Sequence, residues 1–69
     1  MDALDKEMAN RKSEIQGALE LLFKTNLTIT DWDVPEADDT KAAQMIADLM
    51  QEALDTIKAD IAGGKYDDY

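Results

Sequence analysis

The chain has 69 residues, no Cys, no His and a formal net charge of −9. A chain this short forms one domain at most, and without Cys or His it forms neither a disulfide nor a zinc site of the usual kind. No apolar run approaches the roughly 20 residues that span a bilayer, and the charged first residues lack a signal peptide's apolar core. We therefore expect a cytoplasmic protein that binds neither membranes nor, because of its negative charge, nucleic acid directly.

Residues 3–24 form the first predicted helix. At 100° per residue its apolar side chains fall in one stripe about 140° wide, which is typical of an amphipathic helix. The members of this stripe are Leu4, Met8, Ile15, Ala18, Leu19, Leu22 and Phe23. Asp2 is a suitable N-cap, and Asn26 can adopt the left-handed conformation that ends a helix.

Residues 39–62 form the second predicted helix. Its apolar stripe, again about 140° wide, consists of Ala42, Ala43, Ile46, Leu49, Met50, Ala53, Leu54, Ile57 and Ile61. Met45 lies off this stripe and is expected at the surface. Asp38 or Asp39 can cap the start, although Asp33–Glu36 also has the pattern of a capping box, and Gly63–Gly64 ends the helix.

Two helices of similar length predict an all-α fold, an antiparallel helical hairpin that occupies residues 1–64 as one domain. The polar residues 65–69 are expected to be disordered. Because a hairpin covers only part of each stripe, we expect it to pair into a helical-bundle homo-oligomer, most simply a dimer. The predicted self-association residues are Ile15, Leu19, Leu22, Ile46, Leu49, Met50, Ala53 and Ile57.

Residues 25–38 are expected to connect the two helices. Leu27 and Ile29 alternate with threonines, as in a short extended strand. Residues 27–40 contain five acids and neither Lys nor Arg, so this stretch has a charge of −5, more than half of the net −9. It also holds Trp32, the only Trp of the chain.

The sequence offers little for catalysis or for metal binding. Without His or Cys, Ser13 has no candidate base, so we expect no enzyme activity. Asp31–Asp33 begins like a calcium-binding EF-hand loop, but Glu36 stands where that loop needs Gly, and Ala42 stands where it needs a bidentate Glu. We therefore predict neither a metal site nor a cofactor.

Trp32 has two interpretations. In the first, it folds back with Leu27, Ile29 and Val34 and closes the end of the bundle. In the second, it is the apolar anchor of a surface that meets a protein with a basic surface. The residues of that predicted partner-binding surface are Asp31, Trp32, Asp33, Glu36, Asp38 and Asp39.

These patterns favour a non-enzymatic regulator, inhibitor or adaptor that binds another protein, a type common among phage and prophage accessory proteins. Two alternatives predict different surfaces. A nucleic-acid mimic would spread its acids along one helix face, for which Asp48, Glu52 and Asp55 are available. A structural subunit of a larger helical assembly would expose further apolar side chains, such as Leu21 and Met45.

Overall fold

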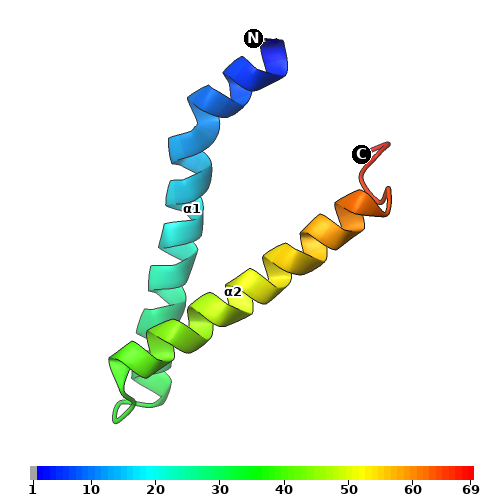
Figure 1. Ribbon diagram of the computed structural model, residues 1–69. Coiled ribbons are helices and arrows are strands. Elements are labelled where there is room, and N and C mark those ends of the chain that lie inside the picture. The colour runs from blue at the N-terminus through cyan, green and yellow to red at the C-terminus, as the bar shows by residue number, and fades with distance from the viewer. Residues whose placement is uncertain (1) are drawn as a thin grey trace.

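A computed structural model describes residues 2–69 and contains two α-helices that run in opposite directions (Figure 1). α1 spans Ala3–Asp33, and α2 spans Asp39–Ala62. Residues 34–38 turn the chain between the helices, and residues 2–69 contain no β-strand. The all-α antiparallel hairpin predicted from the sequence is therefore confirmed. Neither of the two described helices is long and apolar enough to cross a membrane.

The first helix is longer than predicted, so the expected connection over residues 25–38 is wrong. The residues that suggested a strand instead continue α1 as far as Asp33. Their polar side chains donate hydrogen bonds to carbonyl oxygens four residues earlier: Thr25 to Leu21 (2.9 Å), Asn26 to Leu22 (2.8 Å), Thr28 to Lys24 (3.0 Å) and Thr30 to Asn26 (2.9 Å). These groups are thus satisfied within the helix, and the weak β-preference of Thr and Ile does not decide the conformation.

Pro35 explains where α1 ends. A proline disfavours the helical conformation of the residue before it, and Val34 has φ −133° and ψ 76°. The Val34 N–H still donates to the Thr30 carbonyl oxygen at 2.8 Å, which completes the last turn of the helix. The Ala37 N–H then donates to the Val34 carbonyl oxygen at 3.0 Å, so the connection is short and tight.

Both helix starts have carboxylate caps. Asp2 accepts a hydrogen bond from the Asp5 N–H at 2.9 Å, as predicted for α1. Asp38 accepts from the N–H groups of Thr40 (2.9 Å) and Lys41 (3.2 Å), so α2 begins at Asp39 and not at the earlier capping-box pattern. The end of α2 at Gly63–Gly64 also agrees with the prediction, and Gly64 has a positive φ of 86°.

The two helices cross near the turn and diverge toward the chain ends (Figure 1). Ala42 is the only buried residue within residues 2–69, at 8% exposure. Its neighbours Ala43 and Ile46 are half-buried, as are Phe23 and Leu27 on α1. The radius of gyration is 16.0 Å, whereas a compact domain of this length would have about 11 Å. The hairpin is therefore open, and one copy builds almost no core.

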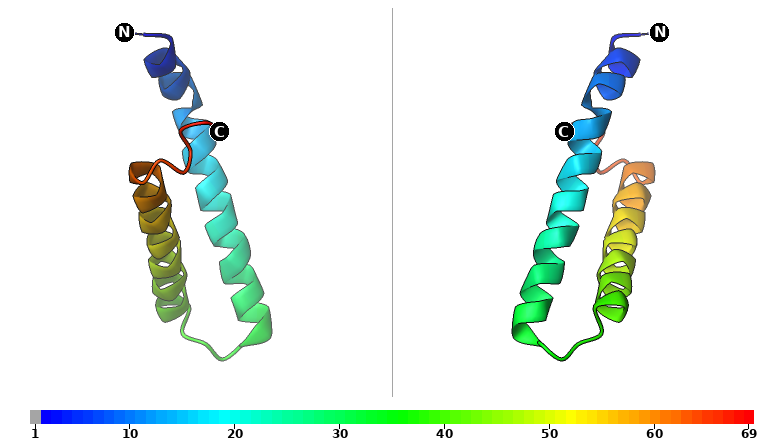
Figure 2. Two further views of the ribbon diagram at one scale, coloured as in Figure 1. Left: turned by 90° about the vertical axis from the view of Figure 1, so that its right-hand side faces the viewer. Right: turned by 90° about the vertical axis from the view of Figure 1, so that its left-hand side faces the viewer.

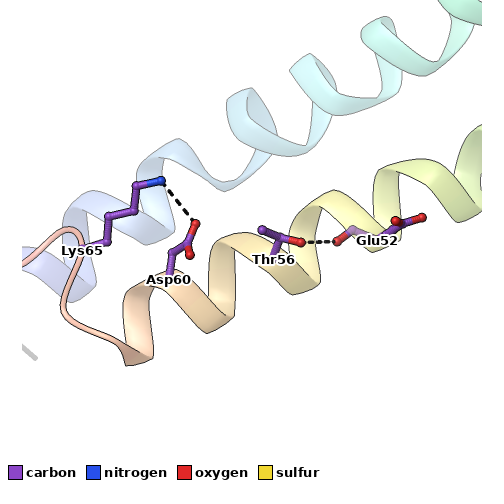
Figure 3. A network of polar contacts seen from close by, with 4 residues as sticks. All are labelled: Glu52, Thr56, Asp60 and Lys65. Carbon is purple, nitrogen blue, oxygen red and sulfur yellow. Dashed lines mark hydrogen bonds and ion pairs between the residues drawn. The ribbon is translucent and has the colours of Figure 1, made fainter.

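Residues 63–68 form turns beyond α2, although disorder was predicted for residues 65–69. The Lys65 N–H donates to the Asp60 carbonyl oxygen at 3.0 Å, and the Lys65 Nζ lies 3.4 Å from Asp60 Oδ2 (Figure 3). The rings of Tyr66 and Tyr69 meet edge to face with their centroids 5.5 Å apart. All of these contacts are local and exposed, so they add little to the stability of the hairpin.

Candidate protein-binding surface

All six residues of the predicted partner-binding surface lie at the turn end of the hairpin. They come from the last turn of α1, from the turn itself and from the N-terminus of α2. We call this group the acidic end; its members are Asp31, Trp32, Asp33, Glu36, Asp38 and Asp39. The tight turn brings the members together, because it places the C-terminus of α1 beside the N-terminus of α2 (Figure 1).

Trp32 points away from the hairpin. Its side chain is 76% exposed. At 100° per residue it lies 140° around α1 from Leu27, which is half-buried against α2. Within one hairpin Trp32 therefore does not fold back onto the helices, and its closing of the end of a bundle of several copies stays a prediction. Of the other proposed plug residues, Ile29 and Val34 are also exposed. Trp32 instead presents a large aromatic surface to the solvent.

Two carboxyl groups of the acidic end influence each other. Asp39 lies beside Asp31, and the interaction with the Asp39 side chain is the main reason why the pKa of Asp31 is raised; partial desolvation and the charge of Asp39 act in the same direction. Asp31 and Asp33 also sit at the C-terminus of α1, where the last turn contains no basic residue and the helix dipole disfavours negative charge. The arrangement is thus electrostatically unfavourable without a nearby cation.

The acids of this surface have no ion-pair partners among residues 2–69. The ion pairs among the described residues are Arg11–Glu14, Lys24–Glu20 and Lys65–Asp60. None of them involves a residue of the acidic end. The acidic end therefore keeps its full negative potential, which attracts cationic groups from the surroundings.

An apolar groove adjoins the acidic end. It has a volume of about 520 Å³, and most of its lining is apolar, including Val34, Ala37, Met45 and Leu49. Asp38 and Lys41 are among its polar residues. Met45 is exposed, as predicted from its place off the stripe. The sequence did not reveal the groove, since Val34 and Met45 come together only through the turn.

The hairpin leaves most of the predicted self-association residues uncovered. Ile46 and Met50 are half-buried between the helices. The others are exposed; they are Ile15, Leu19, Leu22, Leu49, Ala53 and Ile57. An isolated copy thus exposes a large apolar area to water, which is unusual for a monomeric soluble protein. The structure does not itself contain a second copy, so pairing stays a prediction.

Within residues 2–69, no three or more of the Asp and Glu side chains gather in a way that could hold a metal ion.

No protein family, curated protein or solved structure matches this chain. The assignment of a function therefore rests on the residues of the chain and on their arrangement.

Proposed function

We propose that this chain is a non-enzymatic protein-binding module of the cytoplasm that acts as a regulator, inhibitor or adaptor of a partner with a basic surface. The observation that carries this proposal is the acidic end: a Trp32 side chain that is 76% exposed among five carboxylates without ion-pair partners. The module works as a homo-oligomer, most simply a dimer, because one hairpin leaves its apolar residues uncovered.

The two kinds of residue at the acidic end have separate roles. Exposed carboxylates attract a basic partner over a distance of about a Debye length and speed its approach. Trp32 supplies the contact area that holds the complex, and Trp is enriched among the residues that dominate binding energy. An exposed Trp with no structural partner is otherwise a liability in water, so its position at the most acidic part of the chain supports a binding role.

Nucleic-acid mimicry is a second candidate, because α2 has a row of exposed acids on its outer face. Asp48, Glu52 and Asp55 lie within about 60° of one another around the helix. Asp48 and Asp55 accept hydrogen bonds from Gln44 (3.1 Å) and Gln51 (3.0 Å), which hold the carboxylates in place. This row is short, however, and it carries three charges where the acidic end carries five.

Two triple variants of equal charge separate these candidates. The first neutralises the acidic end (Asp31→Asn, Asp33→Asn, Asp39→Asn), and the second neutralises the row on α2 (Asp48→Asn, Glu52→Gln, Asp55→Asn). Each variant and the wild type serve as bait for quantitative capture from the source cells, after circular dichroism has shown that each is folded. We expect binding partners to be lost with the first variant and retained with the second. The reverse pattern would favour mimicry, and full retention by both would refute the acidic end as the binding surface.

A second pair of variants tests the aromatic anchor. Trp32→Ala is compared with Leu21→Ala, because Leu21 lies within about 20° of Trp32 around α1 and is similarly exposed, at 66%. Once a captured partner is purified, we expect Trp32→Ala to speed its dissociation by a factor that corresponds to about 2 kcal/mol. Leu21→Ala should leave the dissociation rate unchanged. Equal effects of both substitutions would show that Trp32 is not an anchor.

A further inference from the structure

The continuous α1 reveals a row of apolar side chains that α2 does not cover. Met8, Ile15, Leu22 and Ile29 follow one another at seven-residue intervals, and each is exposed. A seven-residue spacing drifts only about 20° per step around a helix, so these side chains form a nearly straight row. A row of this kind is typical of helices that pack lengthwise against another helix. The row became visible only because α1 extends to Asp33 and so includes Ile29.

The row belongs to one face of the hairpin that continues onto α2. Asn26, a helical neighbour of Leu22 and Ile29, lines a groove of about 390 Å³ together with Leu49 of α2. Leu49 and Met45 are themselves 65% and 56% exposed. Another groove between the helices is lined by Leu19, Phe23, Met50 and Leu54 together with the polar Gln16, Glu20 and Gln51. We call the side that carries the row the open face; its members are Met8, Ile15, Leu22, Ile29, Met45 and Leu49.

We propose that a second copy of this chain packs on the open face in the antiparallel direction, with the two hairpin turns at opposite ends of the dimer. Charge decides this direction. Residues 27–40 carry five acids and no cation, so turns at the same end would bring two charges of −5 together. Residues 2–14 carry four acids and the three cations Lys6, Arg11 and Lys12, a balance of −1. The antiparallel arrangement places the acidic end of each copy beside these cations of the other.

The spacing of the row agrees with this arrangement. When Ile15 of one copy lies opposite Leu22 of the other, Met8 comes opposite Ile29 by the same symmetry. In that register the first turns of α1 in one copy lie level with the acidic end of the other. One alignment therefore pairs the apolar residues and keeps the two acidic ends apart.

The unequal helix lengths favour the same direction. With a rise of 1.5 Å per residue, α1 is about 46 Å long and α2 about 36 Å, so the first turns of α1 extend beyond α2 (Figure 2). Leu4 and Met8 on this extension are exposed. In the antiparallel dimer, this extension lies over the turn end of the second copy, where Val34 and Met45 border an apolar groove.

This arrangement makes the dimer bivalent, an inference that rests on the proposed function of the acidic end. The two acidic ends lie on the order of 40 Å apart and point in opposite directions. Two partner molecules, or two sites on one extended partner, can thus be bound at once, which raises the apparent affinity without any new contact. A parallel dimer would instead present both acidic ends side by side to a single site.

A distance measurement between spin labels tests the direction of pairing. The chain has no Cys, so Thr40→Cys, an exposed and uncharged position at the start of α2, takes a single nitroxide label. We expect electron–electron distances on the order of 40 Å from double electron–electron resonance. A distance below about 20 Å would indicate a parallel bundle, given helix spacings of about 8–10 Å, and would overturn the inference. A folded monomer in sedimentation equilibrium would overturn it as well.

Disulfide exchange tests the register with a second readout. An equimolar mixture of the Ile15→Cys and Leu22→Cys variants should form mixed disulfides at least several-fold faster than either variant forms disulfides with itself. Preferential formation of the same-residue disulfides would refute the antiparallel register. Neither experiment involves a partner protein. If these experiments refute the antiparallel dimer but the acidic end still captures a partner, the proposed function stands. If they support the dimer but the capture experiment fails, the antiparallel dimer stands without the proposed function.

Discussion

Truncation of Leu49 shows whether the open face is an interface, because the chain provides a matched control. In the single hairpin Leu49 and Leu21 are equally exposed, at 65% and 66%. If the chain were a monomer, Leu49→Ala and Leu21→Ala would remove similar, mostly hydrated side chains and would have similar small effects. In the dimer, Leu49 lies on the open face and is covered, whereas Leu21 lies on the outer side of α1 and stays in water.

The size of the difference follows from the exposed fraction. Full burial of a Leu side chain contributes about 1.5–3 kcal/mol, so covering the 65% of Leu49 that one hairpin leaves exposed contributes roughly 1–2 kcal/mol per copy. A symmetric dimer buries Leu49 twice, and Leu49→Ala should therefore weaken it by roughly 2–4 kcal/mol. This loss raises the dimer dissociation constant by roughly 30-fold to 1,000-fold. Leu49→Asp should abolish the dimer, because it would bury a charge without a partner.

Sedimentation equilibrium of the wild type and of the two Ala variants measures these constants. Urea unfolding at two protein concentrations provides a second readout, since the stability of a dimer rises with concentration and that of a monomer does not. Equal dissociation constants for Leu49→Ala and Leu21→Ala would refute the assignment of Leu49 to an interface. A wild type whose unfolding is independent of concentration would refute the dimer itself.

Three further substitutions test the local structure. Gly17→Ala should stabilise the chain by about 1 kcal/mol, because no atom other than those of the adjoining helix backbone and chain neighbours lies within 4 Å of the added Cβ; a lower urea midpoint would contradict this. Asp38→Ala should cost about 1 kcal/mol by removing the cap of α2, and thermal unfolding measures the loss. The neighbouring Asp39 raises the pKa of Asp31, so folding is disfavoured once pH rises through that raised pKa and both groups are charged. Asp31→Asn should therefore raise the melting temperature at neutral pH, with a gain that disappears on acidification; a gain of equal size at acidic pH would refute the repulsion.

The sequence predicted α2 almost completely because its signals are local. Asp38 caps the first N–H groups, the apolar stripe has helical spacing, and two glycines end the helix. The start of α1 at Ala3, directly after the cap Asp2, was predictable for the same reason. Each of these signals depends on residues no more than about one helical turn away, so it acts whatever the rest of the chain does.

The end of α1 was predicted wrongly because its signals conflict. Thr28, Ile29 and Thr30 favour extended structure in isolation, and the alternation of apolar and polar residues suggested a strand. In the hairpin the threonine hydroxyls bond to the helix's own carbonyl groups, and the stop comes only at Pro35. Propensity differences of less than about 1 kcal/mol per residue are easily overridden when one side of a helix is partly buried, as it is here at Leu27 and Thr30.

The amino-acid sequence by itself determined that the chain is a helical hairpin with wide apolar stripes, and that its negative charge gathers around Trp32. These properties depend on spacing and composition along the chain. Only the tertiary structure decided the direction of Trp32, the contact between Asp31 and Asp39, and which apolar residues remain uncovered. The physical reason is that a tight turn fixes how α1 is rotated about its axis relative to α2. A change of a few residues in the length of that turn would rotate every side chain to a different side while leaving the sequence pattern unchanged.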